Sequence, residues 1–178
     1  MNAPPTIETD RLRLRAYRIS DLDGHAAMMG DAEVVRFLGG QRLDREQSWR
    51  MMIGVPGLWD FLGYGFWAAE RRDDGEFLGQ VGFGEFERDI APPIDGRPEM
   101  GWLFAPHAQG RGYAHEACRA ALDWADEALA GQEIVAIIDP DHERSLRLAA
   151  RLGFGDRVTA RYKNEDIVLL RRKAGLAT

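Results

Sequence analysis

One stretch, residues 106–117, constrains this chain more than any other; it reads Pro-His-Ala-Gln-Gly-Arg-Gly-Tyr-Ala-His-Glu-Ala. The apolar and aromatic segment just before it, residues 99–104, is typical of a strand. After it, apolar residues recur from Ala114 to Leu129 with the spacing of a helix packed along one face, and Gly131 is placed to end that helix. The stretch therefore predicts a glycine-containing turn that joins a strand to a helix N-terminus.

Such a turn is suited to binding an anion. Gly110 and Gly112 have no Cβ, so backbone amides there can point together into a concavity and approach a ligand closely. The unpaired N–H groups and the dipole of a helix start favour negative charge, and Arg111 adds a positive one. The Gly-Lys-Ser/Thr ending of a P-loop is missing, and no ribose-binding acidic residue follows at the dinucleotide-fold spacing. The residues alone leave a phosphate site and a plain tight connection both open.

The rest of the pattern predicts seven strands and four helices. The strands are expected at 9–15, 65–70, 77–86, 99–104, 134–138, 158–162 and 166–170. Helices are expected from Ser20 or Asp21, from about Asp44, from Ala114 and around Leu146. Asp-Asp-Gly at 73–75 predicts a hairpin, and three prolines within 88–98 exclude a regular ladder there. In the first strand, Arg11, Arg13 and Arg15 are interpreted as a solvated face.

Residues 109–114, Gln-Gly-Arg-Gly-Tyr-Ala, resemble the Gln/Arg-x-x-Gly-x-Gly/Ala signature of the GNAT acetyltransferases, whose loop holds the pyrophosphate of acetyl-coenzyme A. The flanking Glu-Met-Gly-Trp-Leu and His-Glu-Ala are similar to the RimJ/RimL branch, which acetylates protein N-terminal amines. A second resemblance precedes Leu-Gly-Phe at 152–154: the family usually has Asn-x-x-Ser there, and this chain has His142 and Ser145. The resemblance covers the chain from Thr9 to about Leu170.

The resemblance implies an α/β (α+β) fold: one domain over residues 1–178 with a central mixed, mostly antiparallel twisted sheet. It also implies an N-acetyltransferase that moves an acetyl group from acetyl-CoA to a primary amine by direct attack in a ternary complex. The single cysteine separately favours a cytoplasmic location. The residues implied to contact the coenzyme are Trp102, Leu103, Phe104, Gln109, Gly110, Arg111, Gly112, Tyr113, Ala114, His142 and Ser145.

The chemistry of amine acetylation needs a proton acceptor, because an ammonium has no lone pair with which to attack. By resemblance Glu99 is the first candidate, acting directly or through water, and Glu85, which ends the neighbouring strand, is the second. The oxyanion is expected to be stabilised by amides of residues 102–104. Many GNATs have a tyrosine that protonates the leaving thiolate; Ala149 occupies that position, which leaves Ser145 as the donor by resemblance.

Two aromatic residues near Pro56-Gly57, Trp59 and Phe61, are interpreted as loop-borne candidates for substrate contact, with ordinary packing as the alternative. Cys118, the only cysteine, lies on the apolar stripe of a helix and is interpreted as a core residue, which fits a reducing compartment. The four histidines have no ligand-like spacing, so no metal is expected.

A formal net charge of −6 argues against non-specific nucleic-acid binding, and no apolar run suggests a membrane span. The N-terminus shows no secretory signal. The expected partner is an amine-bearing acceptor, either a peptide N-terminus or a small molecule. The sequence leaves open whether the chain forms a homodimer. Two other functions stay open: a coenzyme-A-binding regulatory module without turnover, favoured by the missing tyrosine, and a plain interaction domain. An interaction domain would not bind acetyl-CoA, whereas an acetyltransferase and a regulatory module both would.

Overall fold

The computed structural model describes residues 3–173, and its contacts divide the chain into two compact units. The first unit comprises the residues up to Gly82 together with Trp102–Ala121. The second comprises Phe83–Gly101 and the residues from Leu122 onward. Strand β6 (Glu99–Phe104) and helix α4 (Tyr113–Ala128) contribute residues to both units, so each of the elements flanking the predicted turn is shared between them.

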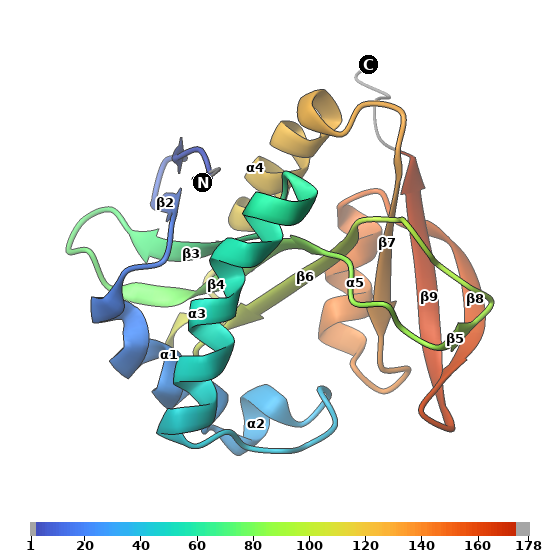
Figure 1. Cartoon of the computed structure of the whole chain (residues 1–178), viewed down its shortest axis with the longest axis horizontal. Helices are drawn as coiled ribbons and strands as arrows, with labels where there is room; N and C mark the ends of the chain where they lie inside the picture. Colours follow the sequence, from blue (N-terminus) through green and yellow to red (C-terminus); the bar gives the residue numbers. More distant parts are fainter. Residues whose placement is uncertain (1–2, 174–178) are drawn as a thin grey trace. The chain divides into compact units, whose positions relative to one another are not determined.

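In the first unit, antiparallel strands pair in the order β1 (Ile7–Glu8), β2 (Leu12–Arg15), β3 (Phe66–Arg71) and β4 (Phe77–Gly84) (Figure 1). The Ala105 N–H donates to the Leu78 carbonyl at 2.8 Å, which joins β4 to the end of β6. The helices of this unit are α1 (Leu22–Met29), α2 (Ala32–Val35) and α3 (Arg45–Leu62), with 3-10 turns η1 (Ile19–Asp21) and η2 (Pro106–Ala108).

In the second unit, β6 pairs in parallel with β7 (Glu133–Ile138) at Glu99 and Val135. Antiparallel pairing then continues through β9 (Glu165–Lys173), β8 (Gly155–Tyr162) and β5 (Ile90–Ala91) (Figure 1). Helix α5 (Glu143–Arg151) lies between β7 and β8 in the chain. A core of buried apolar residues holds these strands together: Ile90, Ile94, Val135, Ala160 and Leu169.

The predicted fold class is confirmed: the described residues form a mixed, mostly antiparallel α+β architecture. They contain nine strands and five α-helices, where seven and four were expected. The additional strands, β1 and β5, have two residues each, and β5 falls in the proline-containing segment 88–98. The additional helix, α2, is one turn long, and Asp31 caps it by accepting from the N–H groups of Glu33 and Val34. Elements this short carry no readable hydrophobic period.

Helix α3 corrects one prediction. It begins as expected at Asp44, whose carboxylate accepts from the Gln47 N–H at 2.8 Å while the Gln47 side chain accepts from the Asp44 N–H at 3.0 Å. However, it continues through Pro56 and ends only at Gly63, which has a φ of 76°. A proline costs a helix one hydrogen bond and often kinks it, but it need not end it. Trp59 and Phe61 are therefore helical and do not lie in a loop.

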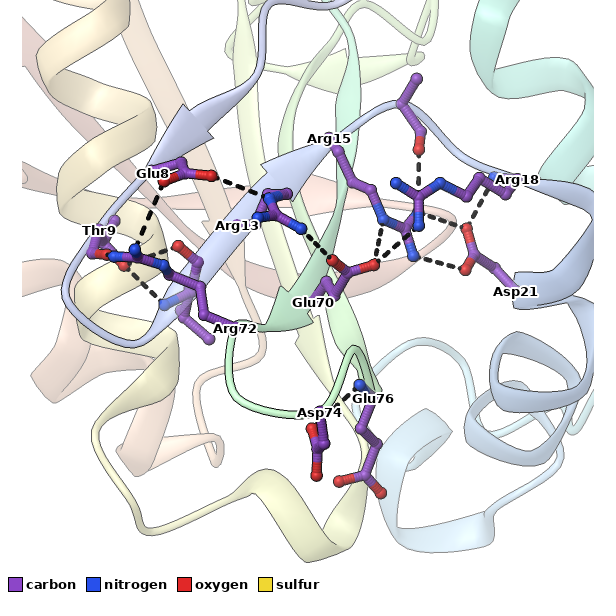
Figure 2. A network of polar contacts seen from close by, with 12 residues as sticks. Glu8, Thr9, Arg13, Arg15, Arg18, Asp21, Glu70, Arg72, Asp74 and Glu76 are labelled. Atoms are coloured by element: carbon purple, nitrogen blue, oxygen red, sulfur yellow. Dashed lines mark hydrogen bonds and ion pairs between the residues drawn. The ribbon is translucent and has the colours of Figure 1, made fainter.

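The arginines of β2 correct a second prediction, because Arg15 is only 4% exposed. Its guanidinium donates to Glu70 at 2.6 Å and to both carboxylate oxygens of Asp21 at 2.7 and 2.8 Å (Figure 2). Glu70 is buried as well, and it also accepts from Arg13 and Arg18 at 3.0 and 3.1 Å. The interpretation as a solvated face fails here because the partners of Arg15 are brought in by β3 and η1, which the alternation within β2 cannot reveal.

Candidate active site

The turn between β6 and α4 has the conformation that its glycines predict. After η2, Gly110 and Gly112 have φ values of 74° and 81°, in the left-handed region that side chains with a Cβ disfavour. The Gln109 side chain fixes the start of the turn by donating to the Phe104 carbonyl at 3.0 Å. Helix α4 begins at Tyr113, and the Glu116 N–H makes an early helical bond to the Gly112 carbonyl at 3.1 Å.

The surroundings of the turn leave room for an anion. A Cβ built on Gly110 would meet no protein atom within 4 Å, so the space in front of this glycine is open. Gly110, Arg111 and Gly112 are all exposed. The first N–H groups of a 16-residue helix have no carbonyl partners within the helix and carry its positive dipole end. Open space before Gly110 and the N-terminus of a helix behind it are features that anion-binding turns share.

Three residues outside the predicted site gather at the same turn. The Glu116 carboxylate accepts from the Thr9 hydroxyl at 2.6 Å and from the Arg11 Nε at 2.7 Å. Arg11 also donates from Nη1 to the Arg111 carbonyl at 2.9 Å. No local sequence signal links Thr9 and Arg11 to Glu116, since more than 100 residues separate them.

In the second unit, Glu99 is paired with an arginine. Arg88 donates from Nε and Nη2 to the two carboxylate oxygens of Glu99 at 2.6 and 2.9 Å, and from Nη1 to the Tyr162 hydroxyl at 3.1 Å. The Arg88 guanidinium also lies over the Tyr162 ring, 5.0 Å from its centroid. Burial lowers the pKa of Arg88, but the hydrogen bonds and charge of Glu99 outweigh it, so that pKa is raised overall. Glu99 is thus a buried carboxylate held in a fixed orientation.

A small cavity adjoins this pair, and four of its eight lining residues are acidic. Its walls are formed by Glu85, Phe86, Glu87, Arg88, Ile94, Asp95, Arg97 and Glu99. Glu85, the second candidate for a base, accepts from the Gly96 N–H at a long 3.4 Å. The segment 85–97 and the first residue of β6 therefore line one small cavity, with room for about a water molecule, and both candidate bases are among its lining residues.

The predicted pair before α5 lies together. Ser145 is buried, and its Oγ is 3.4 Å from Nε2 of His142. Burial lowers the pKa of His142, partly offset by the charge of Asp139, so its ring is neutral at pH 7. His142 lies at the N-cap of α5 without making a side-chain capping bond. A neutral imidazole next to a buried hydroxyl can either donate to it or accept from it, depending on the tautomer.

Of the two aromatic candidates, Trp59 is a packing residue. It is 2% exposed, its ring packs edge-to-face on Trp67 with centroids 4.7 Å apart, and its indole N–H donates to the Phe66 carbonyl at 3.2 Å. These contacts leave it no face for a substrate. Phe61, in contrast, is 89% exposed on the same helix.

Cys118 is buried in α4, and burial raises the pKa of its thiol far above the usual range, as expected of a core cysteine rather than a nucleophile. Within residues 3–173, no group of three or more histidine, cysteine, aspartate or glutamate side chains is arranged to hold a metal ion. Over the same residues, no helix is long and apolar enough to cross a membrane.

The fold and the strand–turn–helix at residues 99–128 can be compared with known proteins. The family model "Acetyltransferase (GNAT) domain" matches residues 11–155, and the chain belongs to this family. The protein is an N-acetyltransferase, and members of its family use acetyl-CoA to acylate amines.

Individual relatives agree with this assignment. YkkB of Bacillus subtilis is 32% identical over 98% of this chain and 99% of its own length. A protein from Bordetella pertussis assigned to the GnaT-family acetyltransferases is 32% identical, with a TM-score of 0.82 over 95% of this chain and 99% of its own. RimL, a ribosomal L7/L12 alpha-N-protein acetyltransferase solved in complex with coenzyme A, is only 17% identical; its TM-score of 0.75 over 95% and 98% of the two chains shows a common fold.

Proposed function

We propose that this protein transfers an acetyl group from acetyl-CoA directly to a primary amine while both substrates are bound. The observation that carries the proposal is the turn at residues 109–114, with two left-handed glycines, an open space before Gly110 and a helix start behind it. The pyrophosphate of the coenzyme binds the amides of this turn, and Arg111 adds a charge. RimL, which has the same fold, was solved with coenzyme A, and this supports the assignment.

Glu99 receives the proton of the attacking amine, directly or through water. Two carboxylate oxygens offer about four lone-pair positions, and Arg88 occupies two of them, so Glu99 keeps acceptor capacity while the guanidinium holds its orientation. The cavity beside it, with four acidic side chains and two arginines, suits a cationic amine better than an anion. The acceptor is therefore an amine that arrives as an ammonium, such as a peptide N-terminus or a small-molecule amine.

The transfer itself needs one bond formed and one broken. The amine nitrogen attacks the thioester carbonyl carbon, and backbone amides of residues 102–104 stabilise the oxyanion that forms. Collapse of this intermediate breaks the C–S bond, and the second proton that the nitrogen loses passes to the departing thiolate, so that the coenzyme leaves as the free thiol. Ser145, beside a neutral His142, donates a hydrogen bond to the departing sulfur. Trp102 follows Glu99 by three residues in β6, which brings the proposed base and the oxyanion amides into one strand.

The resemblance of Glu-Met-Gly-Trp-Leu at 99–103 and His-Glu-Ala at 115–117 to the RimJ/RimL branch supports a peptide N-terminus as the first acceptor to test. In this proposal residues 1–178 work as one catalytic domain in the cytoplasm, with neither metal nor nucleic acid, and a homodimer is the assembly to look for.

The test is thiol release from acetyl-CoA in the presence of an amine panel: peptides with free N-termini, peptides whose only amine is a lysine side chain, polyamines and aminoglycosides. We expect turnover with at least one class and intersecting initial-velocity lines, because both substrates must be bound together. Parallel lines would indicate an acetyl-enzyme and contradict direct transfer. Tight coenzyme binding without transfer to any class would favour the regulatory module instead.

A further inference from the structure

Glu116 lies in the first turn of α4, close to the proposed phosphate site, and its carboxylate is fully engaged by the start of the chain. One oxygen accepts from the Thr9 hydroxyl at 2.6 Å and from the Arg11 backbone N–H at 2.9 Å. The other accepts from the Arg11 guanidinium, at 2.7 Å from Nε and 2.6 Å from Nη2. The Glu116 side chain is 17% exposed and the Arg11 side chain 47%, so the carboxylate is half-buried while its arginine partner reaches the surface.

Arg11 extends this contact to the turn itself. Its Nη1 donates to the Arg111 carbonyl at 2.9 Å, and its guanidinium lies 4.6 Å from the centroid of the Tyr113 ring. Its Nη2 is 3.4 Å from the position that a Cβ would take on Gly112. One side chain from the segment before β2 therefore contacts Arg111 and Tyr113 and lies beside Gly112 between them.

The charges explain why such an arrangement matters. A carboxylate in the first helical turn is favourable for the helix dipole but would repel a phosphate bound to the same amides. Burial raises the pKa of Glu116, but the hydrogen bonds from Thr9 and Arg11 outweigh it and lower that pKa overall, so the group is ionised at neutral pH. Arg11 neutralises this charge at close range and holds the Arg111 carbonyl, whose lone pairs would also repel an anion, in a fixed direction.

We propose that Thr9, Arg11 and Glu116 are positioning residues for the turn at residues 109–114, and that they set the affinity for the phosphate-bearing half of the coenzyme. None of them needs to touch the reacting atoms. This inference rests on the proposed function, and it assigns a role to residues outside the family signature in the turn.

The critical variant is Arg11→Ala, which releases the Arg111 carbonyl and leaves Glu116 without its cation. We expect kcat/KM for acetyl-CoA to fall about tenfold or more through KM, the scale of one lost charge-assisted hydrogen bond, with kcat nearly unchanged. S-acetylpantetheine, which lacks the phosphates, should be used equally well by wild type and variant. A fold-wide defect would instead reduce the rate with both thioesters.

Two milder variants keep the test informative if Arg11→Ala fails to fold. Thr9→Val removes the hydroxyl at constant size, and we expect the Kd for coenzyme A in isothermal titration to rise about threefold or more. Thr9→Ser restores the hydroxyl and should restore the affinity. Arg45→Ala is the matched control, since Arg45 pairs with Asp23 at 2.7 Å on the exposed surface of the same unit and should leave both thioesters unaffected.

The outcomes separate the two levels of the proposal. If wild type does not bind coenzyme A, the proposed function itself fails. If wild type binds but Arg11→Ala and Thr9→Val bind equally well, the positioning role is overturned while the function stands. Equal losses with acetyl-CoA and S-acetylpantetheine would also overturn it, because the residues would then support the fold and not the phosphate site.

Discussion

The open space in front of Gly110 gives a quantitative test of the coenzyme site. Gly110 has a φ of 74°, and a Cβ there would meet no protein atom within 4 Å. Gly63, at the end of α3, has a φ of 76° and equally open surroundings. Alanine at either position should cost about 1–2 kcal/mol of stability from left-handed backbone strain alone. For a chain of this length that lowers Tm by about 2–8 °C.

The two variants should differ only in coenzyme affinity. In Gly110→Ala the new methyl group occupies the space through which a phosphate approaches the backbone. Losing one amide–phosphate hydrogen bond costs about 1.5–3 kcal/mol, which is a rise in Kd of about 10- to 150-fold. Gly63→Ala should keep the wild-type Kd despite the same loss of Tm.

The assay is isothermal titration of coenzyme A into both variants, with Tm from thermal unfolding. A wild-type Kd in folded Gly110→Ala would refute the reasoning, since the backbone there would not face the coenzyme. An equal rise in Gly63→Ala would refute it as well, by attributing the loss to general destabilisation.

Three further predictions concern the base and the buried charges. Glu99→Gln should keep coenzyme affinity and lower kcat by about 10²–10⁴-fold. The defect should shrink as pH rises, because more of the amine is then already deprotonated. Glu85→Gln is the control, and a larger loss of kcat in Glu85→Gln than in Glu99→Gln would make Glu85 the base. Arg15→Met should destabilise the fold by about 3–5 kcal/mol in chemical denaturation, because buried Asp21 loses its cation and buried Glu70 loses the nearest of its three arginines. Arg45→Met, in an exposed pair, should cost less than about 1 kcal/mol, and equal losses would contradict this. Burial lowers the pKa of His25, so the unfolded chain binds a proton more readily than the folded one, and the free energy of unfolding should fall as pH drops below about 6.5. His25→Phe should flatten this pH dependence in chemical denaturation. An unchanged slope in the variant would mean that another group causes the dependence.

The sequence predicted the turn at residues 109–114 because its determinants are local. Glycines that permit left-handed backbone and a helical apolar stripe fix the strand, the turn and the helix start within about 30 residues. The hairpin at Asp73–Gly75 was predictable for the same reason: Gly75 has a φ of 77°, and β3 and β4 pair across it.

Contacts made by distant segments were not predictable. Arg11 and Arg15 both belong to an alternating pattern that reads as a solvated face, yet Arg11 binds Glu116 in α4 and Arg15 binds Glu70 in β3. The pairing of Glu99 with Arg88 is likewise invisible until segment 85–97 is folded beside β6. The loop predicted after Pro56 was wrong for another reason. A proline usually favours the end of a helix, but here α3 continues beyond it, and Trp59 on the continuing helix packs against Trp67.

The most direct measurement is titration of acetyl-CoA into Gly112→Asp and Gly131→Asp. Both glycines have left-handed φ values, 81° and 83°, but only Gly112 lies in the proposed phosphate site. In Gly112→Asp the new Cβ lies 3.4 Å from Nη2 of Arg11, so the carboxylate competes with Glu116 for Arg11 and adds a negative charge to the turn; we expect Kd to rise about 100-fold or more. Gly131→Asp, in the turn after α4, should bind as the wild type does. Wild-type affinity in a folded Gly112→Asp variant would contradict the proposal that the turn at residues 109–114 binds the coenzyme.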